Sequence, residues 1–373
     1  PGVGKSVTSR LILNLFLAMK KKVALASPTG RAAKRLQELT GYEAKTVHRL
    51  LEWSPKERTF LRTEDNPLDV DVLIVDEASM LDIFLADKIF NALKETSKII
   101  LIGDQDQLPS IGPGYVLSHL IHSKVIPTVR LTEIFRQGKT SSIVTSAHKI
   151  NTGKEPDFPS DKVSDCHFIE TPNHDYLISK IKYFLFKELP ELGFSPHGMQ
   201  ILSPMNKGIL GCINLNKEIQ KSFQNNRDKS RPLSNGSYEF YIKDRVIQLS
   251  NNYDLGVFNG DIGSISKIDY QEKTLCIDFG SNSVIYEKDQ LSNLALAYAI
   301  TIHKSQGSEF PVVFIPLVCE HTHMLNRNLV YTALTRAKQI AVLMGSKKTL
   351  LHAIKKHETV KRQSLLKERL MGK

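Results

Sequence analysis

Short apolar runs recur along the chain, and each ends in a polar turn. Runs rich in Val, Ile and Leu are typical of strands that are buried on both faces of a parallel sheet. Stretches with helical periodicity separate several of them, for example 6–20 and 30–39. This alternation predicts right-handed crossovers and doubly wound α/β layers. Such sheets bind ligands at the carboxyl ends of their strands, so candidate chemistry is sought there. The runs are KKVALASPTG, DVDVLIVDEAS, SKIILIGDQDQ, GMQILSPMN, LALAYAITIHKS, FPVVFIPL and KQIAVLMGS.

Two stretches interrupt the alternation. Residues 48–68 contain two short apolar runs around the turn sequence Ser54-Pro55-Lys56-Glu57, which predicts a β-hairpin. Residues 236–291 contain several short strand patterns separated by turns such as Asn259-Gly260. We expect this second stretch to form a small β-barrel that is inserted in the second α/β unit.

These patterns predict two domains. The first covers 1–126 and includes the hairpin at 48–68, and the second covers 127–373 and includes the barrel at 236–291.

The net charge is +11, but residues 347–373 alone carry nine Lys or Arg against two Glu, which leaves +4 for the rest. Blocks of like charge are usually solvated faces or tails, so this basic tail does not by itself identify a polyanion partner.

The four cysteines lie more than forty positions apart, with no CxxC pair. This spacing predicts neither a zinc site nor a disulfide framework, and favours buried thiols in a cytoplasmic protein. No apolar run reaches the roughly 18 residues that a membrane span requires, and no signal peptide pattern precedes the first helix. We therefore expect no membrane association.

The first residues, PGVGKS, match the end of a phosphate-binding loop. The full pattern has Gly, four free residues and then Gly-Lys-Ser/Thr, so the sequence is expected to start inside the motif. The backbone N–H groups of Gly2, Val3 and Gly4 would surround phosphate oxygens at a helix N-terminus. Lys5 would reach the β- and γ-phosphates of ATP, and the Ser6 hydroxyl would bind Mg²⁺.

Two further strand ends carry candidate catalytic groups. Asp76 and Glu77 follow a buried strand: Asp76 can hold Mg²⁺ through water, and Glu77 can accept a proton from an attacking water. Gln107 follows a third strand, in GDQDQLPSIGPG, where it could sense the γ-phosphate or orient the water. The structural alternatives are a solvated strand end and a polar turn.

With these motifs the chain resembles superfamily 1 helicases of the RecD and conjugative relaxase-helicase type. The resemblance covers nearly the whole chain, and its last two motifs are the most diagnostic. It implies two RecA-like P-loop domains, with a wedge hairpin in the first and an SH3-like barrel in the second. The matching segments, in order, are PGVGKS, SPTGRAAKRL, TVHRLL, VLIVDEASM, GDQDQLPSIGPG, LTEIFRQ, YAITIHKSQGSEF and YTALTRAK.

The resemblance also assigns nucleotide contacts to the second domain. It implies that Arg136 and Arg336 reach the γ-phosphate across a cleft, where a guanidinium stabilises charge on the transferring phosphoryl group. Gly307 and Glu309 match a motif that touches the ribose and phosphates. Without that context, a lone arginine is more often a surface residue.

A channel for single-stranded DNA is implied over both domains. Hydroxyls, amides and a lysine can hold phosphates, and a histidine can stack on a base. Each histidine could equally be a structural residue, and Trp53 and Phe60 could pack the base of the hairpin without touching DNA. The residues that the resemblance places in the channel are Pro28, Thr29, Gly30, Arg31, Thr46, Val47, His48 and Thr301 through Ser305, including His303 and Lys304.

The function implied is an ATP- and Mg²⁺-dependent DNA helicase that moves 5′→3′ on single-stranded DNA and acts at duplex junctions in recombination and repair. Partner subunits of a repair nuclease complex are compatible with it. Three alternatives remain: a nucleic-acid-stimulated ATPase that does not unwind, a helicase that tracks on RNA, and a non-enzymatic interaction module.

Overall fold

A computed structural model describes residues 3–132, 141–158, 164–224, 231–252, 254–280, 282–356 and 364–372. The chain divides into two compact units. The first consists of Pro1–Thr140 together with Glu358–Lys373, and the second of Ser141–His357. The domain boundary expected at 126/127 remains a prediction.

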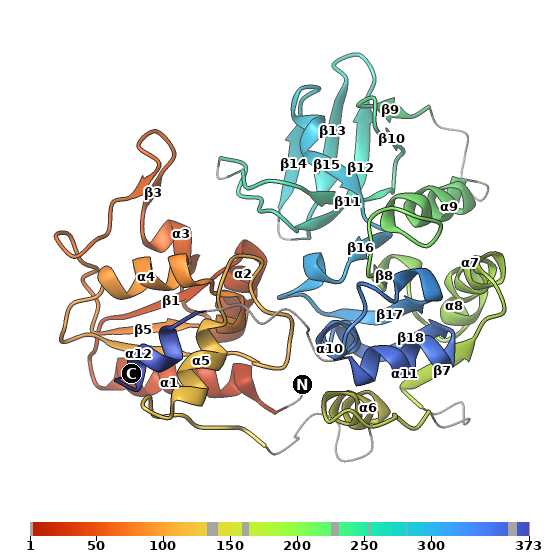
Figure 1. Ribbon diagram of the computed structural model, residues 1–373. Helices are drawn as coiled ribbons and strands as arrows, with labels where there is room; N and C mark the ends of the chain where they lie inside the picture. The colour runs from red at the N-terminus through yellow and green to blue at the C-terminus, as the bar shows by residue number, and fades with distance from the viewer. Residues whose placement is uncertain are drawn as a thin grey trace. The chain divides into compact units, whose positions relative to one another are not determined.

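A parallel sheet of four strands forms the centre of the first unit (Figure 1). Its strand order is β2 (Ala44–Thr46), β1 (Val23–Ser27), β5 (Val72–Val75) and β6 (Lys98–Leu101). The helices around it are α1 (Lys5–Ala18), α2 (Gly30–Thr40), α3 (Val47–Leu50), α4 (Ile83–Asn91) and α5 (Val116–Ser123).

Strand β5 is buried on both faces, as its apolar run predicts. Its side chains alternate between two hydrophobic clusters because successive residues of a strand point to opposite faces. Val72 and Ile74 pack with Leu13 of α1 and Leu36 of α2. Leu73 and Val75 pack with Ile89 of α4 and Leu117 of α5. Helices therefore cover both sides of the sheet, which confirms the doubly wound α/β arrangement.

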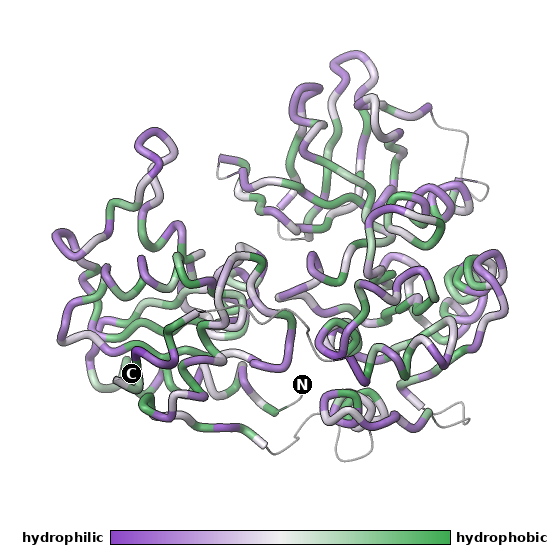
Figure 2. The backbone as a smooth tube through the Cα atoms, viewed as in Figure 1, coloured by the Kyte–Doolittle hydropathy of each residue, from purple (hydrophilic) through white to green (hydrophobic). Residues whose placement is uncertain are grey.

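The predicted hairpin is present in the first unit. Strands β3 (Trp53–Ser54) and β4 (Thr59–Phe60) pair antiparallel, with Trp53 opposite Phe60. The turn at 55–58 carries Arg58 in the left-handed region at a φ of 54°. Figure 2 shows that the tip of this hairpin is hydrophilic, whereas the neighbouring sheet strands are hydrophobic.

The second unit contains a parallel sheet of five strands. Its order is β16 (Ala299–Thr301), β8 (Met199–Ser203), β17 (Phe310–Leu317), β18 (Ala337–Gly345) and β7 (Cys166–Glu170). The helices of this unit include α6 (Ser142–Asn151), α7 (His174–Tyr183), α8 (Leu189–Glu191), α9 (Cys212–Gln224), α10 (Arg327–Leu334) and α11 (Lys347–Lys355).

The predicted meander forms an antiparallel sheet within the second unit. Its hydrophobic interior joins that of the parallel sheet in one continuous cluster, in which Val246 and Ile265 of the meander pack together with Ile201 and Phe314. The strand order is β14 (Ser283–Tyr286), β13 (Thr274–Asp278), β12 (Ile262–Asp269), β11 (Arg245–Gln248) and β15 (Leu294–Leu296), and the short strands β9 (Leu233–Ser234) and β10 (Glu239–Phe240) pair separately.

The basic C-terminal stretch does not form one tail. Helix α11 buries Leu350 and Ile354 in the second unit, each at 1% exposure. Helix α12 (Leu366–Leu370) instead packs in the first unit. Leu366 therefore packs in the first unit, whereas Leu350 and Ile354 pack in the second.

The cysteines differ in burial. Cys166 and Cys212 are buried thiols, and burial raises the pKa of each to about 12. Cys276 is half-buried and Cys319 is exposed, so the expectation of buried thiols is wrong for Cys319.

Within the described part of the chain, no helix is both long enough and apolar enough to cross a membrane.

Candidate functional site

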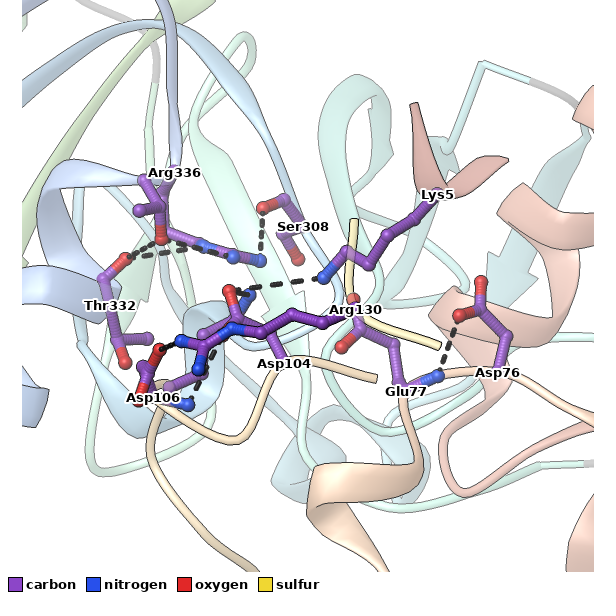
Figure 3. A network of polar contacts seen from close by, with 11 residues as sticks. Lys5, Asp76, Glu77, Asp104, Asp106, Arg130, Ser308, Thr332 and Arg336 are labelled. Carbon is purple, nitrogen blue, oxygen red and sulfur yellow. Dashed lines mark hydrogen bonds and ion pairs between the residues drawn. The ribbon is translucent and has the colours of Figure 1, made fainter. Parts of the chain in front are cut away.

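The backbone at the N-terminus of α1 suits anion binding. Gly4 lies at the N-cap of α1 in the left-handed region, at φ 82°, which a glycine adopts without strain. The first turn of α1 carries no acidic side chain, so its backbone N–H groups and helix dipole remain available to an anion. The Nζ atom of Lys5 lies 3.9 Å from a carboxylate oxygen of Asp104, as Figure 3 shows.

Asp76 directly follows β5 and is half-buried. Burial raises its pKa to about 6, the neighbouring Glu77 carboxylate contributes in the same direction, and the backbone N–H of Glu77 with Lys5 and Arg35 offsets part of the shift. That N–H donates a 2.8 Å hydrogen bond to Asp76 (Figure 3). A buried carboxylate with a raised pKa is stabilised when a cation binds beside it.

Glu77 is held in an unusual conformation for its residue type. Its φ of 52° lies in the left-handed region, which costs energy for a residue with a Cβ. One of its carboxylate oxygens is buried and has no hydrogen-bond partner in the described structure. A buried acceptor without a donor is costly, and a bound water would relieve that cost.

Asp104 connects the end of β6 to the loop that follows it. Burial alone would raise the pKa of Asp104, but Lys5 and hydrogen bonds from the Asp106 N–H and the Gln107 amide hold it below its ordinary value. The Gln107 amide donates at 3.1 Å, and only 5% of Gln107 is exposed. Farther along, Arg130 lies 3.8 Å from the Asp106 carboxylate (Figure 3).

The residues present fit a magnesium ion that is carried by a nucleotide. No group of three or more His, Cys, Asp or Glu able to hold a metal occurs among the described residues. Mg²⁺ in nucleotide sites is typically held by one or two protein carboxylates, together with phosphates and waters. The half-buried Asp76 carboxylate and the Glu77 oxygen that lacks a hydrogen-bond partner provide such a partial set.

The two expected DNA-contacting motifs of the first unit lie side by side. They begin at the carboxyl ends of neighbouring strands, where Ser27 of β1 pairs with Thr46 of β2. The Thr29 hydroxyl accepts a hydrogen bond from the Ala32 N–H and caps α2, and the Thr46 hydroxyl caps α3 in the same way. Pro28 and Arg31 are half-buried beside these caps.

His48 packs against the base of the hairpin. Its ring centroid lies 5.5 Å from that of Phe60, and the Trp53 and Phe60 rings lie 4.8 Å apart, nearly edge to face. Burial lowers the pKa of His48, with an opposing effect of Asp82, so the ring is neutral near pH 7. Trp53 and Phe60 pack against each other at the hairpin base, as the structural alternative expected, and His48 joins them.

In the second unit, Arg336 is buried at 3% exposure and bonded within its own unit. Its guanidinium donates to the carbonyl oxygens of Ser308, at 3.1 Å, and Thr332, at 3.3 Å, and to the Thr335 hydroxyl (Figure 3). In this arrangement Arg336 joins α10 to the segment that carries Gly307 and Glu309.

The second-unit candidates lie at two different edges of its sheet. Thr301 ends β16, and its hydroxyl accepts a hydrogen bond from the Lys304 N–H in the turn that also contains His303. Glu309 precedes β17 and Arg336 precedes β18, where the Phe310 N–H donates to the Arg336 carbonyl. The carboxyl-end rule therefore describes Thr301 but not Glu309 or Arg336.

Some predicted residues lie outside the described part of the chain, namely Gly2, Arg136 and the side chain of Ser6. Sequence reasoning missed the role of Asp104 as the partner of Lys5, and it missed Thr332 and Thr335 as partners of Arg336. The place of Asp104 directly after an apolar strand was the available signal. Nothing in the sequence pattern indicated the two threonines.

Three family descriptions match successive parts of the chain. They are the AAA domain over residues 1–113, the ATP-dependent RecD-like DNA helicase SH3 domain over 215–279, and the UvrD-like helicase C-terminal domain over 296–344. The SH3 match covers most of helix α9 and three strands of the antiparallel sheet, β11, β12 and β13. The predicted SH3-like barrel is thereby confirmed.

Two curated relatives align with most of the chain. The ATP-dependent RecD2 DNA helicase of Deinococcus radiodurans is 37% identical over 346 residues, which cover 93% of this chain and 46% of that protein. The RecBCD enzyme subunit RecD of Buchnera aphidicola is 27% identical over 426 residues, covering 96% of this chain and 70% of the relative. The chain thus spans about half the length of the Deinococcus protein.

A solved structure supports the fold. Bacteroides Pif1 bound to single-stranded DNA aligns with a TM-score of 0.54 at 18% identity, over 94% of this chain and 88% of that one. At this identity the likeness concerns the fold alone. The Deinococcus relative, 37% identical over 93% of this chain, together with the domain matches, shows that the chain belongs to the RecD-like helicase family.

Proposed function

We propose that the chain hydrolyses ATP and uses the energy to move along single-stranded DNA and separate duplex DNA. The observation that carries this proposal is the cluster of Lys5, Asp76, Glu77 and Asp104 at the carboxyl edge of one parallel sheet. A lysine at a helix N-terminus, a carboxylate that can bind Mg²⁺ and a second carboxylate with an unpaired oxygen are the groups that phosphoryl transfer to water requires.

Each side chain has a distinct role in this proposal. Lys5 binds the β- and γ-phosphates and exchanges its contact with Asp104 for them. Asp76 with Ser6 holds Mg²⁺, which neutralises charge on the phosphates. Glu77 accepts the proton of the attacking water, because its buried oxygen has no other donor. Gln107 reports the occupancy of the site through its bond to Asp104.

The nucleic-acid track is proposed to run over the ends of β1, β2 and β16. The caps at Thr29 and Thr46 and the turn at 301–305 place backbone N–H groups and Lys304 where they can hold phosphates. His48 then acts through the hairpin it supports, since a neutral, half-buried ring is a poor phosphate ligand. Arg136 and Arg336 are proposed to act on the γ-phosphate.

The relatives support the biological setting. The Deinococcus relative is named as an ATP-dependent DNA helicase, and the Buchnera relative as a subunit of the RecBCD enzyme. We extend to this chain a role in DNA recombination or repair with 5′→3′ movement. Partner subunits are proposed for this chain only by analogy with the RecD relatives, because the name of the Buchnera relative makes it a subunit of the RecBCD enzyme. The name of the Deinococcus relative mentions no complex.

One experiment separates this function from its alternatives. ATP hydrolysis is measured on the full natural chain without nucleic acid, with single-stranded DNA and with single-stranded RNA, and unwinding is measured on duplexes with a 5′ or a 3′ tail. We expect DNA to stimulate hydrolysis and only the 5′-tailed duplex to open, with a Lys5→Ala variant inactive in both assays. Stimulation without unwinding would favour the remodelling ATPase, and stronger stimulation by RNA would favour an RNA track.

A further inference from the structure

Strand β16 stands at the end of the strand order of the second unit's parallel sheet, next to β8. The Ile302 N–H donates to the Ser203 carbonyl of β8. The Tyr298 carbonyl accepts from the Ile201 N–H of the same strand. Main-chain groups of a strand point alternately to its two edges, so those of Ala299 face away from β8. Ala299 is buried, so its N–H and carbonyl need partners from another element.

The side-chain amide of Asn216, on α9, supplies these partners. Its Oδ1 accepts the Ala299 N–H at 2.8 Å, and its Nδ2 donates to the carbonyls of Ala299, at 2.8 Å, and Leu296, at 3.1 Å. The two carbonyls require the nitrogen end of the amide and the N–H requires the oxygen end, which fixes its orientation. Asn216 is 4% exposed and pairs with Ala299 as a residue of a neighbouring strand would. Helix α9 thereby takes the place of a strand at this edge.

Helix α9 is fixed to the sheet by its own contacts. At its start, the Cys212 N–H donates at 3.0 Å to the carbonyl of Met205, in the segment that follows β8. Farther along, Leu215 and Ile219 are fully buried in the hydrophobic cluster that contains Phe314 of β17. Asn216 therefore projects from a helix whose place is set independently of β16.

Strand β16 leads directly into the turn 301–305. The Thr301 hydroxyl accepts the Lys304 N–H at 3.3 Å, and the Ser305 hydroxyl donates to the Ile302 carbonyl at 2.7 Å. These two bonds fix the internal shape of the turn, but they do not fix its place on the sheet. Ala299 lies two residues before Thr301, so the bonds from Asn216 help to set where the turn begins.

We propose that Asn216 is a positioning residue for single-stranded DNA, because it holds β16 in place and, through β16, the turn 301–305. This inference rests on the proposed function, in which that turn holds phosphates. A three-residue strand that is bonded along one edge has few hydrogen bonds to keep it from opening locally. Bonds along both edges keep Lys304 and its neighbouring N–H groups in position for a phosphate, so less ordering is needed on binding.

Asn216→Leu tests this role, with Gln220→Met as the matched control. Leu has nearly the shape of Asn but cannot form hydrogen bonds, and Met stands in the same relation to Gln. Gln220 lies one turn farther along α9 and is also buried. Its amide donates to the Glu239 carbonyl, at 2.7 Å, and to the Asp244 carboxylate. The control therefore loses buried hydrogen bonds of α9 that do not go to β16.

The measurements use the full natural chain. The DNA concentration that half-maximally stimulates ATP hydrolysis should rise about tenfold for Asn216→Leu, as when a phosphate contact is lost, and less than about twofold for Gln220→Met. Turnover at saturating DNA should stay within about twofold of wild type in both variants, because binding and not chemistry is affected. Amide hydrogen exchange in 299–305 should accelerate for Asn216→Leu and not for the control.

Asn216→Ala separates positioning from general stability. The smaller side chain leaves room for water to bond the main-chain groups of Ala299 and Leu296, so this variant should melt closer to the wild type than Asn216→Leu does. Water does not tie β16 to α9, so DNA affinity should still fall about tenfold. An equal loss of affinity in Gln220→Met, or affinities that follow the melting temperatures across the three variants, would overturn the proposal.

Failure of the proposed function would look different. A wild-type chain that does not bind single-stranded DNA contradicts the helicase proposal. The hold of Asn216 on β16 is then decided by hydrogen exchange, because faster exchange in 299–305 for Asn216→Ala, and not for Gln220→Met, supports it without any DNA. A wild-type chain that binds DNA, together with an Asn216→Leu variant of undiminished affinity, contradicts the positioning role alone.

Discussion

The backbone N–H of Glu77 donates a 2.8 Å hydrogen bond to the Asp76 carboxylate, while the Glu77 backbone takes a left-handed φ of 52°. The two facts are connected, because the turn that lets the N–H face Asp76 also directs the Glu77 side chain away from it. Two adjacent carboxylates thereby acquire different surroundings. Asp76 is half-buried and accepts the Glu77 N–H, whereas Glu77 keeps a buried oxygen without a donor. Such a division suits one metal ligand and one general base.

Replacing Glu77 with Gln should separate binding from hydrolysis. The variant loses the base but keeps Lys5, Ser6 and Asp76, so we expect ATP affinity within a few-fold of wild type and turnover lower by about 10²–10⁴-fold. Affinity is measured with a fluorescent nucleotide and turnover by phosphate release with single-stranded DNA. Asp76→Asn serves as the contrasting variant, since it should weaken magnesium-dependent binding itself. Turnover like that of the wild type in Glu77→Gln would remove Glu77 from the mechanism.

The raised pKa of Asp76 predicts a specific pH dependence. The pKa of the Asp76 carboxyl lies near its ordinary value of 3.8 in the unfolded chain, whereas burial raises that pKa to about 6 in the folded chain. Between those values the folded state binds the proton more tightly, so this group lowers the free energy of unfolding as pH rises from 4 to 6. The destabilisation is fully present above pH 6.

Asp76→Asn should therefore raise the melting temperature of the nucleotide-free protein at pH 7.5 and have little effect at pH 4. The gain is on the order of 1–3 kcal/mol. Magnesium with ATP should abolish the difference, because the cation stabilises the ionised Asp76. If the difference in melting temperature between Asp76→Asn and the wild type were the same at both pH values, burial would not be destabilising the ionised Asp76 carboxylate.

The strands of the two parallel sheets followed from local pattern. Apolar runs such as the one that ends at Asp76 are long enough to fix a buried parallel strand, and the polar residue after each run marks the functional edge. The hairpin was predictable because its turn sequence lies between two apolar runs, and its register was then set by the Trp53 and Phe60 pair. In these cases the residues that determine each strand or turn are neighbours in the sequence.

The second-unit site was not predictable in this way. Glu309 and Arg336 lie at the amino ends of β17 and β18, opposite to the edge that the carboxyl-end rule selects. Only family resemblance singled them out. The docking of Leu366 on α5 also escaped prediction, because a five-residue apolar pattern carries no signal for the unit against which it packs. Contacts between residues far apart in the chain depend on tertiary packing that local periodicity does not encode.

Substitution of Arg336 should reveal both a structural and a catalytic effect. Arg336→Ala removes donors to the Ser308 and Thr332 carbonyls, so we expect a stability loss of about 1–3 kcal/mol. If the guanidinium also serves the γ-phosphate, DNA-stimulated turnover falls on the order of a thousandfold, and affinity for single-stranded DNA without nucleotide is retained. Arg336→Lys keeps the charge but not the planar fork, and should restore stability better than turnover. A variant that mainly loses DNA affinity would contradict the catalytic role.

Among the basic residues of α11, a lysine held in an ion pair should contribute less to DNA binding than the other exposed lysines. Lys348 and Lys355 are exposed, whereas Lys347 lies 2.8 Å from the Glu155 carboxylate. Each phosphate neutralised on single-stranded DNA adds about 0.7 to the slope of affinity against salt concentration on logarithmic axes. Lys348→Gln with Lys355→Gln should therefore lower the slope by up to about 1.4, and Lys347→Gln by less. An unchanged slope would identify this helix as a solvated face.

The hairpin should be required for strand separation but not for the motor. Its two strands are held by the edge-to-face pair of Trp53 and Phe60 and by the Glu52–Arg62 ion pair of 2.7 Å at its base. A rigid projection needs no sequence-specific contact to separate strands, because it only has to block one strand while the other is pulled past. The hydrophilic tip agrees with an element that projects into water and does not pack (Figure 2).

Replacing 53–60 with a short Gly-Ser turn should abolish unwinding of a tailed duplex and leave DNA-stimulated ATP hydrolysis within about twofold, since the sheet and its nucleotide site do not include these residues. A second variant changes only the tip, with Lys56→Ser and Glu57→Ser, and keeps the aromatic base and His48 packed. Because a wedge acts through its bulk and stiffness, the tip variant should retain most of the unwinding. Parallel loss of hydrolysis and unwinding in the 53–60 variant would make the hairpin part of the motor fold, through His48 and the neighbouring Thr46 cap. Retention of both activities would place the wedge elsewhere in the molecule.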